Sequence, residues 1–121
     1  MKSRWIEHKG KQILLADYSE LCDDSEAVYA EGQFVIQELR KNPGGAALVI
    51  NDVHDTHASI ANSTMLKKVL AQSSGLVAKR AVIGLTSTTR YFVNALIHLA
   101  GKGSLTQFDS LEKALDWIVE D

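Results

Sequence analysis

Five side chains that could do chemistry lie close together near the middle of the chain: Asp52, His54, Asp55, His57 and Ser59. Imidazole and carboxylate groups bind zinc and other first-row metals, and a serine beside a histidine and an aspartate can act as a nucleophile. Both chemistries need side chains that converge. The sequence has neither a helical His-Glu-x-x-His motif nor a Gly-x-Ser-x-Gly nucleophile elbow to fix that convergence. We therefore expect no catalytic residue, no metal and no cofactor here, but recognition of a ligand or partner.

A predicted buried strand, Ala46 to Val53, positions this loop. Ligands gather at the carboxyl ends of parallel strands in an open α/β sheet, and Asp17 and Thr86 lie at the carboxyl ends of two other predicted strands. Residues 86–90 also offer hydroxyl and backbone N–H groups at a helix start, where an anion is favoured, although ordinary helix capping is the alternative. The candidate ligand- or partner-binding residues are Asp17, Asp52, His54, Asp55, His57, Ser59, Thr86, Ser87, Thr88 and Arg90.

Apolar periodicity and turn residues predict the remaining elements. Strands are expected at Trp5–His8, Lys11–Tyr18, Ala46–Val53, Arg80–Thr86 and Leu105–Phe108, and helices at Asp23–Lys41, Ile60–Gln72, between Thr89 and Gly101, and after Asp109 or Ser110. The order ββαβαβαβα predicts an α/β fold with a mixed, mostly parallel five-stranded sheet opened by a β-hairpin. Right-handed crossovers place about four helices mainly on one face, so the other face is expected to be partly open or covered by a partner.

Four positions carry more specific expectations. Asp23 and Glu26 have the spacing of a capping box at the start of the first helix, and Gly32 weakens the middle of that helix. Gly84 lies inside a strand pattern, which indicates close approach of another backbone. Trp117 falls off the apolar stripe of the last helix, so we expect it to cover an edge of the sheet or to contact a second subunit.

The totals indicate one domain spanning residues 1–121, large enough to bury a core. A formal net charge of -2 gives no electrostatic reason to expect nucleic acid as a partner. Cys22 is the only cysteine in the sequence, which excludes an intrachain disulfide and fits a reducing compartment. No stretch of the sequence is long and apolar enough to span a membrane, so we expect a cytoplasmic protein without integral membrane association.

Several segments together resemble the SpoIIAA-like branch of the small α/β domains of the STAS and CRAL-TRIO type. They are Lys9-Gly10-Lys11 with ILLADYSEL (13–21), Asp52-Val53, VAKRAVIGLTSTTRYFVNALIHLAGK (77–102) and FDSLEKALDWIVE (108–120). The resemblance implies a small bacterial cytoplasmic protein, related to regulatory or ligand-sensing STAS proteins and to lipid-carrying CRAL-TRIO proteins. The chain lacks the Asp-Ser-Ser-Gly sequence whose serine is phosphorylated in anti-sigma-factor antagonists.

These observations favour a non-catalytic STAS-like binding or regulatory module that recognises a protein partner or small ligand through the strand-end loops. Ser59 and Ser63 lie near a helix start, where a phosphate is favoured, so both are candidate phosphorylation sites. Two alternatives stay open. One is a carrier or sensor of a small apolar or amphipathic ligand, lined by Phe92, Leu96, Leu99 and Trp117. The other is a metal-dependent enzyme that uses the loop with Asp52, His54, Asp55 and His57; a homodimer is also left open.

Overall fold

The computed structural model describes residues 1–42, 46–86 and 105–120. Its strands are β1 Arg4–His8, β2 Lys11–Asp17, β3 Ala47–Asp52, β4 Val77–Ile83 and β5 Leu105–Gln107. Its helices are α1 Ser25–Lys41, α2 Ile60–Gln72 and α4 Leu111–Ile118. The α/β class and the mixed five-stranded sheet are confirmed. The helix expected between Thr89 and Gly101 lies outside the described residues, so the full predicted order stays a prediction.

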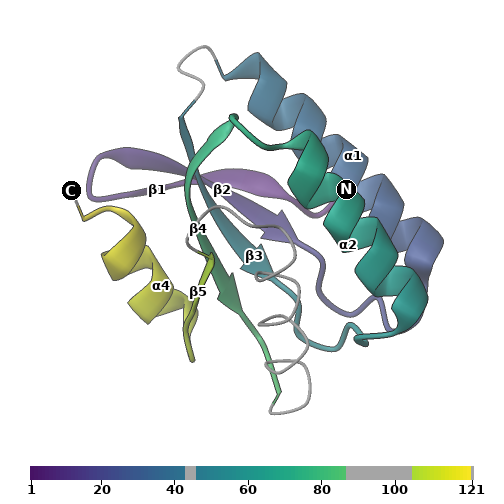
Figure 1. Ribbon diagram of the computed structural model, residues 1–121. Helices are drawn as coiled ribbons and strands as arrows, with labels where there is room; N and C mark the ends of the chain where they lie inside the picture. Colours follow the sequence, from purple (N-terminus) through teal and green to yellow (C-terminus); the bar gives the residue numbers. More distant parts are fainter. Residues whose placement is uncertain (43–45, 87–104, 121) are drawn as a thin grey trace.

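The sheet follows the order of the chain, β1-β2-β3-β4-β5 (Figure 1). β1 pairs antiparallel with β2 through a tight turn, in which Lys9 and Gly10 have φ angles of 51° and 80°. All later pairs are parallel. β4 begins at Val77 rather than at the predicted Arg80, because its first residues already pair with β3. The parallel register brings the carboxyl ends of β2, β3 and β4 to one edge of the molecule.

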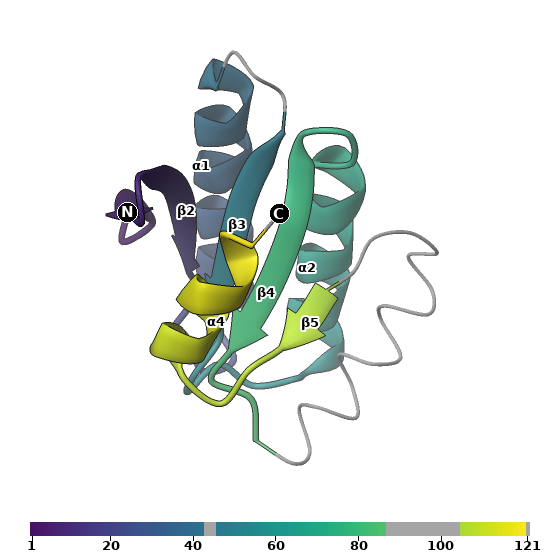
Figure 2. The same ribbon diagram turned by 90° about the vertical axis from the view of Figure 1, so that its left-hand side faces the viewer.

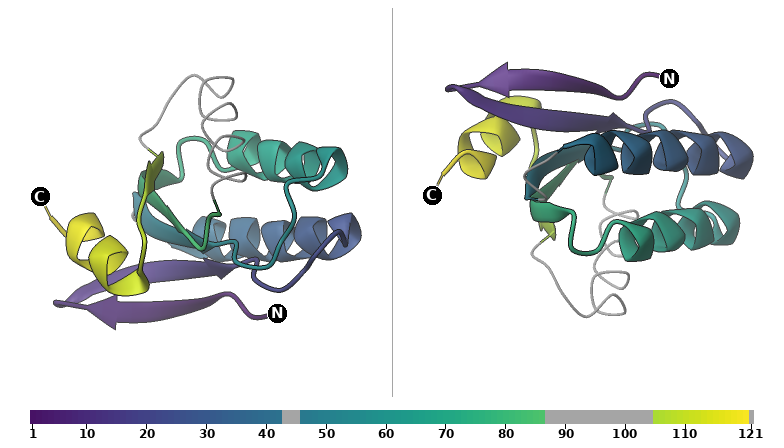
Figure 3. Two further views of the ribbon diagram at one scale, coloured as in Figure 1. Left: turned by 90° about the horizontal axis from the view of Figure 1, so that it is seen from below. Right: turned by 90° about the horizontal axis from the view of Figure 1, so that it is seen from above.

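The described helices lie on both faces of the sheet (Figures 2 and 3). α1 and α2 cover one face side by side, as expected for the connections between successive parallel strands. α4 covers part of the opposite face, against β3 and β4. This second face was expected to be partly open or covered by a partner; where α4 packs, the chain's own last described helix covers it. The crossover rule does not constrain α4, because this helix follows the last described strand and connects no parallel pair.

Two apolar clusters, one on each face of the sheet, hold these layers together. Successive residues of the central strands contribute alternately to one cluster and to the other. Leu14 and Val49 face α1 and α2, whereas Ile13 and Ile50 face α4. All four side chains are almost fully buried. Because successive side chains of a strand point to opposite faces, a one-residue slip in β2 would exchange its two apolar sets. The double-sided burial explains why this strand reads as a continuous apolar run.

Gly32 lies at a close contact between α1 and α2. A methyl group at this position would overlap Cγ2 of Val69, which is 5% exposed. The glycine therefore lets the two helices approach, and the sequence pattern indicated only its cost to the helix. The predicted capping box is wrong, because α1 begins one residue later: the side chain of Asp24 accepts a hydrogen bond from Ala27 N. Ser110 caps α4, one of the two residues expected there.

Trp117 covers an edge of the second apolar cluster. Its ring lies 5.2 Å from that of Phe108, measured between centroids, and the Lys79 ammonium lies 4.2 Å from its ring centroid. Lys79 also donates to the Trp117 carbonyl at 2.8 Å, which ties β4 to the end of α4. Trp117 therefore packs against the apolar cluster under α4, and its expected roles at a sheet edge or a subunit contact stay predictions. Among the described helices, none is long and apolar enough to cross a membrane.

Candidate recognition site at the strand ends

The loops that follow β2 and β3 are joined by backbone hydrogen bonds. Glu20 N donates to His54 O at 2.8 Å, Cys22 N donates to Asp55 O at 3.0 Å, and His57 N donates back to Cys22 O at 2.9 Å. Glu20, Cys22 and Asp55 hold left-handed φ angles of 60°, 50° and 57°. Non-glycine residues rarely adopt such angles, and they persist where surrounding contacts fix them. The two loops therefore form one fixed surface beyond the sheet.

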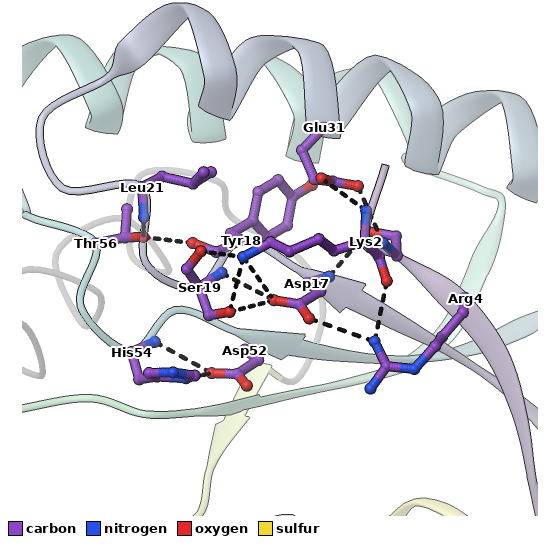
Figure 4. A network of polar contacts seen from close by, with 11 residues as sticks. Lys2, Arg4, Asp17, Tyr18, Ser19, Leu21, Glu31, Asp52, His54 and Thr56 are labelled. Carbon is purple, nitrogen blue, oxygen red and sulfur yellow. Dashed lines mark hydrogen bonds and ion pairs between the residues drawn. The ribbon is translucent and has the colours of Figure 1, made fainter.

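Two buried polar side chains beneath this surface hold the two loops together by hydrogen bonds. The Thr56 hydroxyl accepts a bond from Leu21 N at 3.1 Å and donates to the Tyr18 carbonyl (Figure 4). The Asn62 amide donates to the carbonyls of Cys22 and His57, at 2.8 and 2.9 Å. Each side chain links the loop after β2 to the segment after β3. Because both are buried, these bonds are shielded from competing water.

Gly84, just after β4, supports the loop after β3. It has a φ of 84°, and a Cβ at this position would lie 2.6 Å from His54 N. The expected close approach of another backbone is confirmed, and that backbone belongs to His54. The strand-end loops of β3 and β4 are thus in direct van der Waals contact.

His54 is paired with Asp52 at the rim of this surface. The Asp52 carboxylate contacts Nδ1 of the imidazole at 2.7 Å and accepts a second bond from His54 N at 3.1 Å (Figure 4). The hydrogen bond to Asp52 raises the pKa of His54, and the nearby charges of Asp55 and Glu20 act in the same direction. Ligand atoms of Glu20, His54 and Asp55 lie within 4.8 Å of one another, and all three residues are exposed.

His57, the second histidine of the loop, lies in a separate pair. Its Nδ1 contacts the Asp23 carboxylate at 2.9 Å, and both side chains are more than half exposed. The group of side chains that the sequence placed together is thus divided. His54, Asp52 and Asp55 stay close, whereas His57 turns toward the start of α1. The structure therefore does not bring the four predicted acidic and imidazole groups to one point.

An open groove of about 810 Å³ lies across the joined loops. Its described lining residues are Glu20, Cys22, Asp23, Val53, Asp55, Thr56, His57, Ala58, Ser59, Gly84 and Thr86. They include three carboxylates, from Glu20, Asp23 and Asp55, and no lysine or arginine. Ile60, which follows the groove residue Ser59, is 87% exposed. The described lining of the groove is therefore negatively charged, and an exposed apolar residue follows it in the sequence.

Asp17 belongs to a different network, although it lies beside Asp52 in the strand register. Its carboxylate contacts Lys2 at 3.6 Å and Arg4 at 3.4 Å, and it accepts a bond from Ser19 N at 3.0 Å (Figure 4). Burial opposes ionisation, but the Ser19 hydrogen bonds and the two cations hold the pKa of Asp17 below its ordinary value. This network fixes the start of the chain onto β2, so Asp17 does not join the groove.

The remaining predicted site residues are placed in part. Ser59 lines the groove, and its hydroxyl caps α2 by accepting a bond from Asn62 N at 3.1 Å. Ser63 is 7% exposed and donates its hydroxyl to the Ser59 carbonyl, so a kinase would need local opening to reach it. Thr86 also lines the groove. Ser87, Thr88 and Arg90 lie outside the described residues.

Glu20 and Asp23 were missed as groove residues, although the sequence contains a signal for them. Both follow β2, which reads as a parallel neighbour of the central strand, and parallel neighbours end at the same edge. The left-handed conformations of Glu20 and Cys22, which shape this loop, could not be foreseen from residue type alone. Comparisons with protein-family models, with curated proteins and with solved structures give no match for this chain. Its function is therefore argued from the geometry of the site.

Proposed function

We propose that the protein is a non-catalytic STAS-like binding or regulatory module whose strand-end groove recognises a basic segment of a partner protein. The acidic groove supports the proposal most directly: Glu20, Asp23 and Asp55 line it, without a lysine or arginine among its described residues. A lysine or arginine side chain complements that charge, and complementary charges increase both specificity and the rate of encounter. The exposed Ile60 beside the groove offers an apolar contact to the same partner.

The fixed backbone of the joined loops also supports recognition. A surface held by hydrogen bonds between its loops loses little conformational entropy when it binds, and so favours affinity. A protein partner suits the groove better than a small molecule, because the groove is open and small ligands are usually enclosed on most sides.

The contacts of the two histidines favour binding over catalysis. In the described part of the chain, each imidazole bonds a carboxylate, and neither bonds a hydroxyl or thiol that it could activate as a nucleophile. Within residues 1–42, 46–86 and 105–120, the ligand group available to a metal-dependent enzyme is Glu20, His54 and Asp55, and not the predicted set. Metal analysis of protein purified without a histidine tag tests that alternative.

Affinity capture with three forms of the protein tests the proposed function. The baits are the wild type, a groove variant carrying Glu20→Gln, Asp55→Asn and Ile60→Ser, and a control variant carrying Leu111→Ser and Glu112→Gln. The control makes the same kinds of change on α4, on the opposite face of the sheet. Extracts of the source organism are applied at low salt, and bound proteins are quantified by mass spectrometry.

We expect at least one protein with a basic segment to be captured by the wild type and the control, and to be lost from the groove variant. The purified partner should then bind the groove variant at least about tenfold more weakly, since losing charge pairs at an interface costs a few kcal/mol. Raising the salt concentration should weaken the wild-type complex. Equal capture by all three baits, or a captured partner with no basic segment, would contradict the proposal.

A further inference from the structure

Three hydrogen-bond acceptors meet at the rim of the groove, and their chemistry narrows the kind of basic residue that the groove would take. Ligand atoms of Glu20, His54 and Asp55 lie within 4.8 Å of one another, and all three residues are exposed. Glu20 and Asp55 also line the groove itself. A side chain that enters the groove can therefore reach all three groups of this acceptor cluster together.

The neighbour of His54 decides which of its ring nitrogens carries the hydrogen. Nδ1 lies 2.7 Å from the Asp52 carboxylate (Figure 4), and an ionised carboxylate only accepts hydrogen bonds, so Nδ1 is the donor. In the neutral ring the other nitrogen, Nε2, then carries no hydrogen and is an acceptor. The cluster therefore presents three acceptors, and two of them are negatively charged carboxylates.

The joined loops hold these two carboxylates together. Glu20 N donates to His54 O, and Cys22 N donates to Asp55 O. Glu20 and Asp55 both keep left-handed φ angles. Their backbones therefore stay close although their side chains repel each other. The electrostatic cost of two close carboxylates falls when a cation lies between them.

We propose that the acceptor cluster selects arginine over lysine in the basic segment of the partner, with the guanidinium held between Glu20 and Asp55. The inference rests on the proposed function of the groove. A guanidinium carries five N–H donors in one plane and can serve several acceptors at once, whereas an ammonium is a compact charge with three donors. The guanidinium is also more weakly hydrated, so it gives up less when it leaves water for the cluster.

Peptide binding tests this selectivity. Three fluorescent peptides share one frame, in which glycine alternates with arginine, with lysine or with citrulline. Fluorescence anisotropy is measured at low salt, with EDTA present and at about pH 8.5, where an imidazole is largely neutral. We expect the arginine peptide to bind at least about fivefold more tightly than the lysine peptide, because the planar fork serves more of the acceptors. Citrulline keeps the shape of arginine without its charge, so its peptide should bind most weakly.

Variants of the cluster show where the selectivity arises. Asp55→Asn and Glu20→Gln each remove one charge and keep the shape of the side chain, and His54→Leu removes the imidazole acceptor. Each should lower the ratio of the arginine affinity to the lysine affinity toward one. Glu112→Gln removes an exposed carboxylate from α4, on the opposite face of the sheet, and should keep the ratio of the wild type. Amide NMR spectra identify the folded variants, and one of the three is enough for the test.

The outcomes separate this inference from the proposed function. Equal affinities of the two basic peptides for the wild type, or an unchanged ratio in the folded cluster variants, would overturn the selectivity alone. If neither basic peptide binds, the selectivity is overturned, and the proposed function fails with it when capture from extracts also finds no basic partner. Zinc chloride in place of EDTA tests the other occupant. Stoichiometric zinc that blocks the arginine peptide would show that the cluster is a metal site, and would overturn the proposal.

Discussion

At the scale of single residues, the strand-end surface depends on a few positions where a single contact, or the lack of a side chain, fixes the local conformation. The Asp52 carboxylate fixes the His54 ring, and the missing side chain of Gly84 leaves room for the His54 backbone. The sequence could predict the close approach at Gly84, because a glycine inside a strand pattern often marks a bulge, a bend or the close approach of another backbone. It could not place Glu20 beside His54, because that contact depends on the turns of two separate loops.

The pKa of His54 should lie above 6.5, and replacing Asp52 with asparagine should lower it. Hydrogen bonding to the carboxylate favours the protonated ring. The stabilisation from this pair is therefore fully present below the ordinary histidine pKa and is lost as the pH rises through the raised value. It is small, because the His54 side chain is 46% exposed. Titration of the imidazole resonances by NMR measures both pKa values; identical values in the two proteins would contradict the pairing.

Replacing Gly84 with alanine should destabilise the protein more than replacing Gly75. Both glycines have a positive φ, of 84° and 85°, so each substitution costs about 1 to 2 kcal/mol from the left-handed backbone. A Cβ at position 75 meets no atom within 4 Å, whereas one at position 84 meets the His54 backbone. Urea unfolding gives both free energies. The difference between them measures the contact alone, and equal losses would mean that the loop moves away freely.

At the scale of elements, α1 and α2 form a pair whose spacing is set by one glycine. Gly32 lies opposite Val69, and no larger residue fits without a shift. The sequence predicted α2 with its observed bounds, because Ser59 before it and the apolar spacing within it agree. It misplaced the start of α1, since Asp23 and Asp24 are equally good caps by residue type. In the structure Asp24 is the cap, and the Asp23 carboxylate contacts His57 instead.

Replacing Gly32 with alanine should destabilise the protein by about 1 to 3 kcal/mol, the usual cost of overpacking. In an exposed helix the same change would stabilise by roughly 0.5 to 1 kcal/mol. The sign of the change in the free energy of unfolding therefore shows whether the two helices are in close contact at Gly32. In a background of Val69→Ala, which removes the overlapping methyl groups, Gly32→Ala should become neutral or stabilising. Urea unfolding of the wild type, the two single variants and the double variant completes the cycle. If Gly32→Ala stabilised the protein that keeps Val69, α1 and α2 would have to lie farther apart than the structure shows.

At the scale of the whole molecule, the sheet is packed on both faces, and its central strands contribute to two cores. The periodicity of the strands and helices was sufficient to predict the α/β class and the mixed sheet, since these depend on local pattern. The position of α4 could not be predicted in this way. A helix after the last described strand can return to either face, and the second core, built on Ile13 and Ile50, favours the face opposite α1. The continuous apolar runs of the central strands were the feature of the sequence that indicated a covered second face.

Replacing Ile118 with alanine should cost about 2 to 5 kcal/mol in the free energy of unfolding, as for other fully buried isoleucines. Ile118 is 0% exposed and packs in the core under α4. Leu111 lies on the same helix at 36% exposure, so Leu111→Ala should cost less than about 1 kcal/mol. Urea unfolding with an unchanged m value measures both. Similar costs at the two positions would mean that α4 is not docked as described.

The strand order also has a consequence for how the chain folds during synthesis. Each strand pairs with the one made just before it, so the sheet can grow in step with the ribosome from β1 toward β5. α4 is made after all of these strands, and among the described helices it is the one that covers the apolar side chains of Ile13, Leu15 and Ile50. The nascent protein therefore lacks the cover of α4 over this apolar face of the sheet until that helix has been made. Its need for a chaperone should be greatest in that interval and should end when α4 docks.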